Sequence, residues 1–158
     1  MPLIILSTRI HAPLEICFNL ARSIDLHQES MKHTGEQAVA GITEGLIELG
    51  ESVTWKARHF GIVMKLTSRI TEFSFPAMFI DEMVNGPFHT MKHRHIFKVK
   101  EGYTLMVDEF EYKSPLGILG KVADLIFIKS YMRKLLNQRN QILKDVAESS
   151  EDRKSIVV

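Results

Sequence analysis

The chain has 158 residues, of which 45% are hydrophobic and 25% are charged. This length is typical of one domain, and this balance is typical of a soluble globular protein rather than of a disordered, collagen-like or membrane chain. Twenty basic residues against nineteen acidic ones give a formal charge of +1, so no global electrostatic field favours nucleic acid or an anionic membrane. We therefore expect neither a nucleic acid partner nor stable membrane insertion.

One cysteine, Cys17, excludes an intramolecular disulfide, and no secretory signal peptide is evident, so the sequence predicts a cytoplasmic protein. The most apolar later stretch, residues 116–128, contains Lys121 and Asp124 and is shorter than the roughly 18–20 residues that span a bilayer. One domain is expected over 1–148, followed by a polar, disordered tail over 149–158.

The first third of the chain predicts two strands with two short helices between them. The first strand is rich in β-branched residues, and the first helix carries apolar residues at helical spacing behind a proline suited to a first turn. The expected elements are a strand at 3–11, a helix at 14–21, a helix from about 23–25 to 31, a strand at 37–43 and a loop at 45–50.

From residue 51 onward, apolar and polar residues alternate with a period of two, which predicts an antiparallel meander. A two-residue turn at Phe60 and Gly61 keeps the apolar residues of the first two strands on one face. The third strand has an ambiguous phase. The five strands are expected at 51–59, 62–71, 76–84, 89–100 and 103–113.

The last hairpin permits a prediction of register. A two-residue loop at 101–102 makes paired residue numbers sum to 203, which places Arg94 opposite Glu109 and Lys92 opposite Glu111 on the outer face. The same register places His95 opposite Asp108 on the inner face. A slip of one residue would break the charge pairs and turn the apolar side chains outward.

Ser114 and Pro115 are typical of a helix N-cap and first helical residue, so a long helix is expected from there to about Glu148. At about 1.5 Å per residue this helix is roughly 50 Å long, and it therefore crosses the whole sheet and overhangs it. Gly117 and Gly120 weaken its first turns. Its apolar first half either closes the core or forms a lid that admits a ligand or touches a membrane.

The order strand, two helices, six strands, long helix resembles the helix-grip fold of the START-like (SRPBCC) superfamily, which includes the birch-pollen-allergen and polyketide cyclase/dehydrase types. The resemblance covers about 1–148 and is carried by the element order and by short motifs. These motifs are His11-Ala12-Pro13-Leu14-Glu15, the run 50–61 (GESVTWKARHFG), and Gly86-Pro87-Phe88 ahead of His93-x-His95-x-Phe97.

The resemblance implies an α+β fold in which a curved, seven-stranded antiparallel sheet wraps a long C-terminal helix, with two short helices after the first strand. It also implies a cavity between sheet and helix that holds a small hydrophobic or amphipathic molecule. The resemblance implies no particular reaction, because the superfamily contains carriers, receptors and cyclases.

The predicted cavity is lined by the inner faces of the strands and by the start of the long helix. Its candidate ligand-binding residues are Trp55, Ala57, His59, Met64, Leu66, Phe79, Asp81, Met91, His93, His95, Phe97, Met106, Asp108, Phe110, Tyr112, Val122 and Ile126.

Polar residues on this apolar face are informative, because burying an unpaired polar group costs roughly 1–3 kcal/mol. Three interpretations stay open. In the first, Asp108 orients His95 within an internal network of satisfied hydrogen bonds. In the second, these groups bind the polar end of a ligand, and in the third, His95 is a general acid or base held by Asp108 and aided by His93 or Tyr112.

No metal site and no cofactor are expected. His93 and His95 share a face but stand about 7 Å apart along a strand, which is too far for ideal joint ligation. No nucleophile elbow or glycine-rich phosphate loop is evident, and Cys17 falls on the apolar face of its helix as a core residue.

The leading functional hypothesis is therefore binding of a small hydrophobic molecule. The alternatives are an enzyme of the cyclase/dehydratase or hydrolase type that uses His95 with Asp108, and a regulator that acts through protein partners. The oligomeric state is not indicated.

Overall fold

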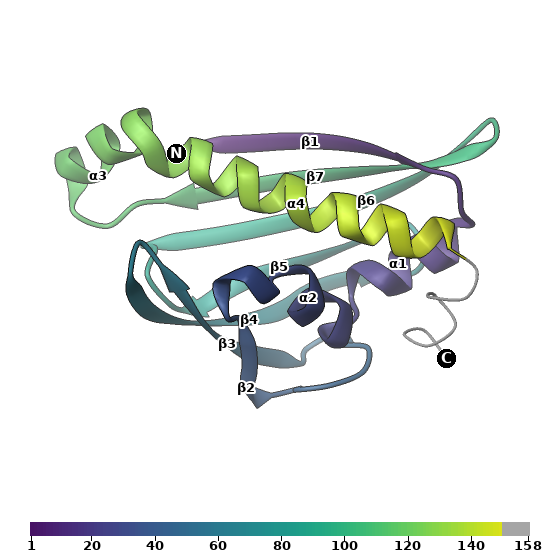
Figure 1. Cartoon of the computed structure of the whole chain (residues 1–158), viewed down its shortest axis with the longest axis horizontal. Coiled ribbons are helices and arrows are strands. Elements are labelled where there is room, and N and C mark those ends of the chain that lie inside the picture. Colours follow the sequence, from purple (N-terminus) through teal and green to yellow (C-terminus); the bar gives the residue numbers. More distant parts are fainter. Residues whose placement is uncertain (150–158) are drawn as a thin grey trace.

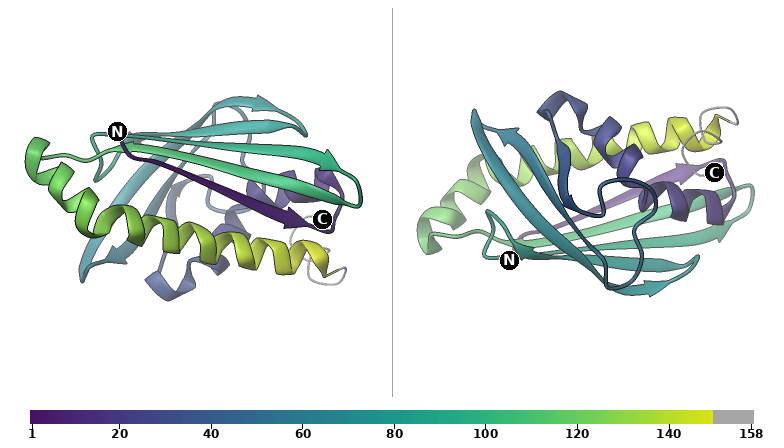
Figure 2. Two further views of the ribbon diagram at one scale, coloured as in Figure 1. Left: turned by 90° about the horizontal axis from the view of Figure 1, so that it is seen from above. Right: turned by 90° about the horizontal axis from the view of Figure 1, so that it is seen from below.

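A computed structural model describes residues 1–149 as a curved antiparallel sheet that wraps a long helix (Figures 1 and 2). The seven strands lie in the order β1-β7-β6-β5-β4-β3-β2. The predicted polar tail lies, apart from its first residue, outside the described residues. The strands are β1 (Leu3–Ile10), β2 (Gln37–Gly41), β3 (Ser52–His59), β4 (Ile62–Ser74), β5 (Met78–Asn85), β6 (Thr90–Lys100) and β7 (Tyr103–Lys113).

Two short helices, α1 (Leu14–Ala21) and α2 (Ile24–Ser30), follow β1 as predicted. They lie on the same face of the sheet as the long helix (Figure 2). Ser23 caps α2, because its hydroxyl accepts a hydrogen bond from the Leu26 amide at 3.1 Å. A one-turn 3-10 helix, η1 (Lys32–Thr34), leads into β2 at the edge of the sheet.

The predicted register of the last hairpin is confirmed. Arg94 pairs with Glu109 across β6 and β7, and its guanidinium donates a hydrogen bond to that carboxylate at 3.0 Å. Lys92 lies opposite Glu111, as predicted, but its ammonium is 3.6 Å from the carboxylate of Glu82 on the other neighbouring strand. The two-residue turn between β3 and β4 is also confirmed by the pairing of the strand residues on either side of it.

Pairing with β6 settles the phase of β5, which the sequence left open. Phe79 lies opposite His95, and Asp81 lies opposite His93. Phe79 and Asp81 therefore share the inner face with these two histidines. This placement brings a second carboxylate beside the His95–Asp108 pair that the register of β6 and β7 predicts.

The long helix spans 117–148 and contains a change of geometry. It consists of α3 (Gly117–Ala123), a π-helical turn η2 (Asp124–Ile128) and α4 (Lys129–Glu148). The predicted start at Ser114 and Pro115 is wrong, because Leu116 at φ +72° separates those residues from the first helical turn. The Ser114 hydroxyl instead donates a hydrogen bond to Asp124 at 2.6 Å.

Most of the core lies at the end of the molecule where α1 packs between the sheet and α4. The ring of Phe18, fully buried on α1, lies 5.0–5.4 Å from the centroids of four aromatic rings from the sheet and the β4–β5 turn. These four rings belong to Phe73, Phe75, Phe79 and Phe97. Because α1 holds the sheet and α4 apart at this end, space is left between them toward the other end.

Gly41 and Gly45 offer a matched pair of substitutions, since both have positive φ (+73° and +77°). A Cβ at Gly41 would lie 2.2 Å from the Ser52 carbonyl oxygen, whereas a Cβ at Gly45 would meet nothing within 4 Å. We expect G45A to cost about 1–2 kcal/mol of backbone strain. G41A should cost several kcal/mol, because β2 must also move away from β3. Urea denaturation measures both, and equal losses would contradict the close approach.

Candidate functional site

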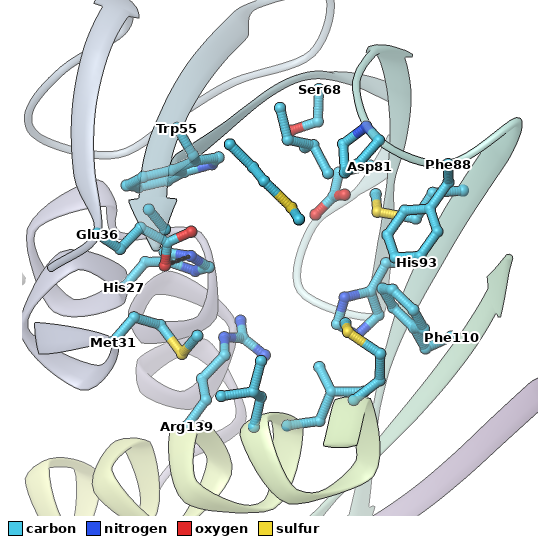
Figure 3. Close-up of a pocket in the computed structure, with 18 of the residues that line it drawn as sticks. His27, Met31, Glu36, Trp55, Ser68, Asp81, Phe88, His93, Phe110 and Arg139 are labelled. Atoms are coloured by element: carbon cyan, nitrogen blue, oxygen red, sulfur yellow. Dashed lines mark hydrogen bonds and ion pairs between the residues drawn. The ribbon is translucent and has the colours of Figure 1, made fainter. Parts of the chain in front are cut away.

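A cavity of about 370 Å³ lies between the inner face of the sheet, α2 and the long helix (Figure 3). The sheet supplies one wall because inner-face residues alternate along β3, β4, β5 and β6. Eleven of the seventeen predicted ligand-binding residues line this cavity. They are Trp55, Ala57, His59, Met64, Leu66, Phe79, Asp81, Met91, His93, His95 and Phe110.

Four of the predicted residues lie behind the lining rather than in it. Phe97 and Met106 pack in the main core, and Tyr112 is fully buried in a second apolar cluster under α4. Asp108 is also fully buried, and it reaches the cavity through its contacts with the two histidines. These four residues therefore support the lining residues from a second layer, away from the cavity.

The predicted positions of Val122 and Ile126 in the lining are wrong. Their side chains are 48% and 67% exposed, because α3 and η2 extend beyond the sheet (Figure 1). Ile126 also lies about 180° around the helix from Leu135, which lines the cavity. Phe127 and Ile128 line the cavity at this end instead.

Sequence reasoning missed Arg139, whose guanidinium points into the cavity (Figure 3). Arg139 is 6% exposed and comes from the apolar face of α4. It donates hydrogen bonds to the Ala21 carbonyl oxygen at 3.2 Å and to the Asn140 side chain at 3.4 Å. A lone basic residue in an apolar helical stripe was the available signal, because buried arginine is rare unless paired.

Sequence reasoning also missed a second polar pair in the lining, His27 and Glu36. The ring of His27 hydrogen-bonds Glu36 at 3.0 Å and stacks on Trp55 with ring centroids 4.2 Å apart. Near the overhanging end, His59 hydrogen-bonds the Tyr131 hydroxyl at 2.7 Å. The cavity therefore has polar groups at its margins and apolar side chains between them.

Asp108 organises a central polar cluster, whose other members are Asp81, His93, His95, Arg139 and Asn140. One carboxylate oxygen lies 2.8 Å from His93 Nε2 and 3.1 Å from His95 Nδ1. The other oxygen accepts a hydrogen bond from the Asn140 amide at 2.8 Å, and Arg139 lies 3.7 Å away. The predicted partnership of Asp108 with His95 is thus present, and the shortest contact of Asp108 with a histidine is the one to His93.

The protonation states follow from burial and from these contacts. Burial alone would raise the pKa of the Asp108 carboxyl, but the hydrogen bond from His93 and the adjacent ring of His95 hold that pKa well below its usual range. Burial would likewise lower the pKa of His95, but the adjacent carboxylates of Asp108 and Asp81 raise it above its ordinary value. Burial, with the neighbouring His95 charge, lowers the pKa of His93 to about 4. Between about pH 4 and pH 6.5, His93 is therefore the neutral imidazole and His95 the charged one.

Asp81, His93 and His95 offer three ligand atoms that lie within 4.8 Å of one another. The argument that the histidines stand too far apart to share an ion is therefore wrong, because their rings stack with centroids 3.8 Å apart. The charges nevertheless balance within the cluster, since Asp81 and Asp108 oppose Arg139 and protonated His95. Neutrality needs no added cation, and the absence of a metal site stays a prediction.

His95 is poorly placed for acid–base catalysis on a ligand. Its Nε2 hydrogen-bonds Asp81 at 3.4 Å, and its Nδ1, 3.1 Å from Asp108, is buried and makes no hydrogen bond with the described residues, so neither ring nitrogen is available to a ligand. A general base needs a free nitrogen directed at the proton it removes. The remaining nitrogen of the cluster, His93 Nδ1, belongs to the ring whose pKa is lowered to about 4, which makes it a weak base.

No family model and no curated protein matches the chain. Solved structures do match. A protein of Thermus thermophilus is 17% identical with a TM-score of 0.74, covering 91% of this chain and 95% of that one. A major latex-like protein of Panax ginseng (15%, TM-score 0.70, 94% and 98%) and a START superfamily protein of Mycobacterium smegmatis (11%, TM-score 0.69, 92% and 97%) are also similar. The helix-grip fold of START-like proteins is thereby confirmed.

The central cluster predicts a large penalty for removing one charge. D108N keeps the shape of the side chain but removes the fully buried counter-ion of Arg139 and leaves His95 with Asp81 alone, which should cost about 3–5 kcal/mol in urea denaturation. The control is E109Q, next along β7 on the outer face, where the pair with Arg94 is about one-third exposed. That change should cost less than about 1 kcal/mol. Similar losses in the two variants would contradict the organising role of Asp108.

The two stacked histidines predict opposite protonation states in mildly acidic solution. At about pH 5.5, imidazole ¹⁵N shifts should show His93 neutral and His95 protonated, although both titrate near pH 6.5 in an unfolded chain. Between about pH 6.5 and 4 the unfolded chain binds a proton at His93 that the folded chain does not, so this residue makes stability fall with acidification. His95 acts oppositely, losing its contribution as pH rises through its raised pKa. A protonated His93 at pH 5.5 would refute this assignment.

Proposed function

We propose that the chain binds a small apolar or amphipathic molecule in the cavity between sheet and helix. The observation that carries this proposal is the cavity itself, whose volume of about 370 Å³ falls within the range of small-molecule sites. A third hypothesis, a regulator that acts through protein partners, would be favoured by a packed interior, which a fold with such a space does not provide.

The walls favour a ligand with an apolar body. Trp55, Met91 and Phe110 line the sheet side, and Leu135 and Leu136 line the helix side. Further methionines also line it, and their flexible thioether side chains adapt to ligands of different shape. Contacts of this kind discriminate weakly between related apolar molecules, so we expect the cavity to accept a class of compounds rather than one.

The polar groups favour a ligand with one hydrogen-bonding end. Arg139 projects from α4 toward the cavity, and Asp81 and His93 project from the facing strands (Figure 3). Contacts with Ala21 and Asn140 use two of the five N–H donors of Arg139, and its other donors can bind an acceptor oxygen of a ligand. A carboxylate, carbonyl or hydroxyl at the end of an apolar chain or ring satisfies this arrangement.

The similarity of fold supports the same proposal, since the resemblance to START-like proteins implies a ligand held between sheet and helix. At the identities found, this support reaches the class of ligand and no further. The alternative of an enzyme that uses His95 as base is less well supported, because both of its ring nitrogens already face carboxylates.

Filling the cavity tests the proposal. Ala57 lies on β3 in the lining, and A57W places an indole in the cavity rather than in packed core. We expect the affinity for the probe 1-anilinonaphthalene-8-sulfonate, and for oleate as its competitor, to fall at least about tenfold, which is 1.4 kcal/mol. Fluorescence titration measures both affinities, and denaturation in urea checks that the variant is folded.

The matched control is A40W, which adds the same ring at an exposed position on β2 outside the lining. This variant should bind the probe as the unmodified chain does. Undiminished binding by folded A57W, or equal losses in both variants, would show that the probe binds elsewhere.

A further inference from the structure

The overhanging part of the long helix exposes an unusual number of large apolar side chains. Leu125 is 88% exposed and Ile118 is 79% exposed, although soluble proteins usually bury such residues. We name this surface the overhang patch. It comprises Leu116, Ile118, Leu119, Val122, Leu125, Ile126 and Phe127 from 116–127, Phe60 from the β3–β4 turn, and Ile62 and Val63 from the start of β4.

The two parts of the overhang patch adjoin each other. The ring of Phe60 lies 5.6 Å from that of Phe127 and 4.4 Å from that of Tyr131, measured between centroids. Phe60, Phe127 and Tyr131 also line the cavity. The exposed apolar surface is therefore continuous with one end of the ligand cavity, and it lies at the end of the molecule opposite the β6–β7 turn (Figure 1).

The two sequence segments that carry the patch are strongly basic. The segments 56–65 and 113–134 contain eight basic residues and one acidic residue, Asp124, which is buried. Their formal charge is thus +7, whereas the whole chain carries +1, so the rest of the chain carries −6. The exposed basic residues are Lys56, Arg58, Lys65, Lys113, Lys121, Lys129, Arg133 and Lys134.

We propose that the overhang patch docks the protein on the surface of an anionic lipid membrane, with the apolar side chains in the interface and the basic side chains against the headgroups. Each basic residue near such a surface contributes about 1 kcal/mol, and the apolar side chains add burial in the acyl boundary. The proposed docking is peripheral, and no helix among residues 1–149 is long and apolar enough to cross a bilayer.

A second copy of the chain fits the patch less well. A symmetric dimer through this surface would bring its two basic segments together, and like charges facing each other across an interface oppose association. An anionic membrane supplies both the apolar medium and the opposite charge. Where the cavity holds a lipid-like ligand, as proposed above, docking also places one end of the cavity beside the source of that ligand.

Co-sedimentation with vesicles tests the docking surface. The chain should bind vesicles of phosphatidylcholine mixed with phosphatidylglycerol, bind vesicles of phosphatidylcholine alone at least tenfold more weakly, and dissociate as salt screens the charges. L125E should lower binding at least tenfold. V99E adds the same charge at a 71% exposed residue in the β6–β7 hairpin and should leave binding unchanged.

Charge reversal separates the electrostatic contribution from the apolar one. K121E combined with K129E should also lower binding at least tenfold, whereas K98E combined with K100E, on exposed lysines of β6, should have a much smaller effect. Equal effects of the two pairs, or equal binding to both kinds of vesicle, would overturn the proposal. A dimer in solution that L125E dissociates, without vesicle binding, would overturn it in favour of a second copy.

The docking surface does not depend on the cavity being a binding site. A57W should bind vesicles as the unmodified chain does, and L125E should bind the fluorescent probe normally. Loss of vesicle binding in A57W would show that the vesicle assay reports the cavity rather than the overhang patch, and it would overturn the docking surface. Failure of the probe assay alone would instead count against the proposed ligand site.

Discussion

The carboxylate of Asp108 is the interaction on which the rest of the site depends. It is fully buried on β7, and it contacts His93 and His95 on β6 and Asn140 and Arg139 on α4. An ionised carboxylate without partners would be very costly at such a place. The contacts therefore fix the distance and angle between the central strands and the long helix, which are the two walls of the cavity.

The same contacts explain how polar groups persist at an apolar cavity. Arg139 projects toward the space between sheet and helix, yet its charge is opposed by Asp108 and its fork is held by the carbonyl of Ala21. His93 remains neutral because burial and the charge of the neighbouring His95 lower its pKa to about 4. The cavity thus offers hydrogen bonding without an uncompensated charge, which suits a neutral or weakly acidic ligand better than a strongly charged one.

The sequence predicted the fold well where the signals were local. Alternation and charge pairing established the register of β6 and β7, and hence the placement of His95 opposite Asp108. Signals were weaker where long-range packing decides. The contact of Asp81 with His95 and the approach of Arg139 from α4 depend on elements distant in sequence. The sequence was sufficient to predict the register of one strand pair, whereas it was not sufficient to predict a cluster built from three strands and a helix.

The long helix shows why apolar residue type alone can misplace a site. A regular helix advances about 100° per residue, so Phe127 and Ile128, four residues before the lining residues Tyr131 and Met132, continue the face of α4 that meets the cavity. Ile126 lies nine residues before Leu135, about 180° around the helix, and the first turns extend beyond the sheet, so Val122 and Ile126 are exposed. The start of the helix therefore presents an exposed apolar surface at one end of the cavity. A helix that only closed a core would gain nothing from this arrangement, because it forfeits the hydrophobic stabilisation of several large side chains.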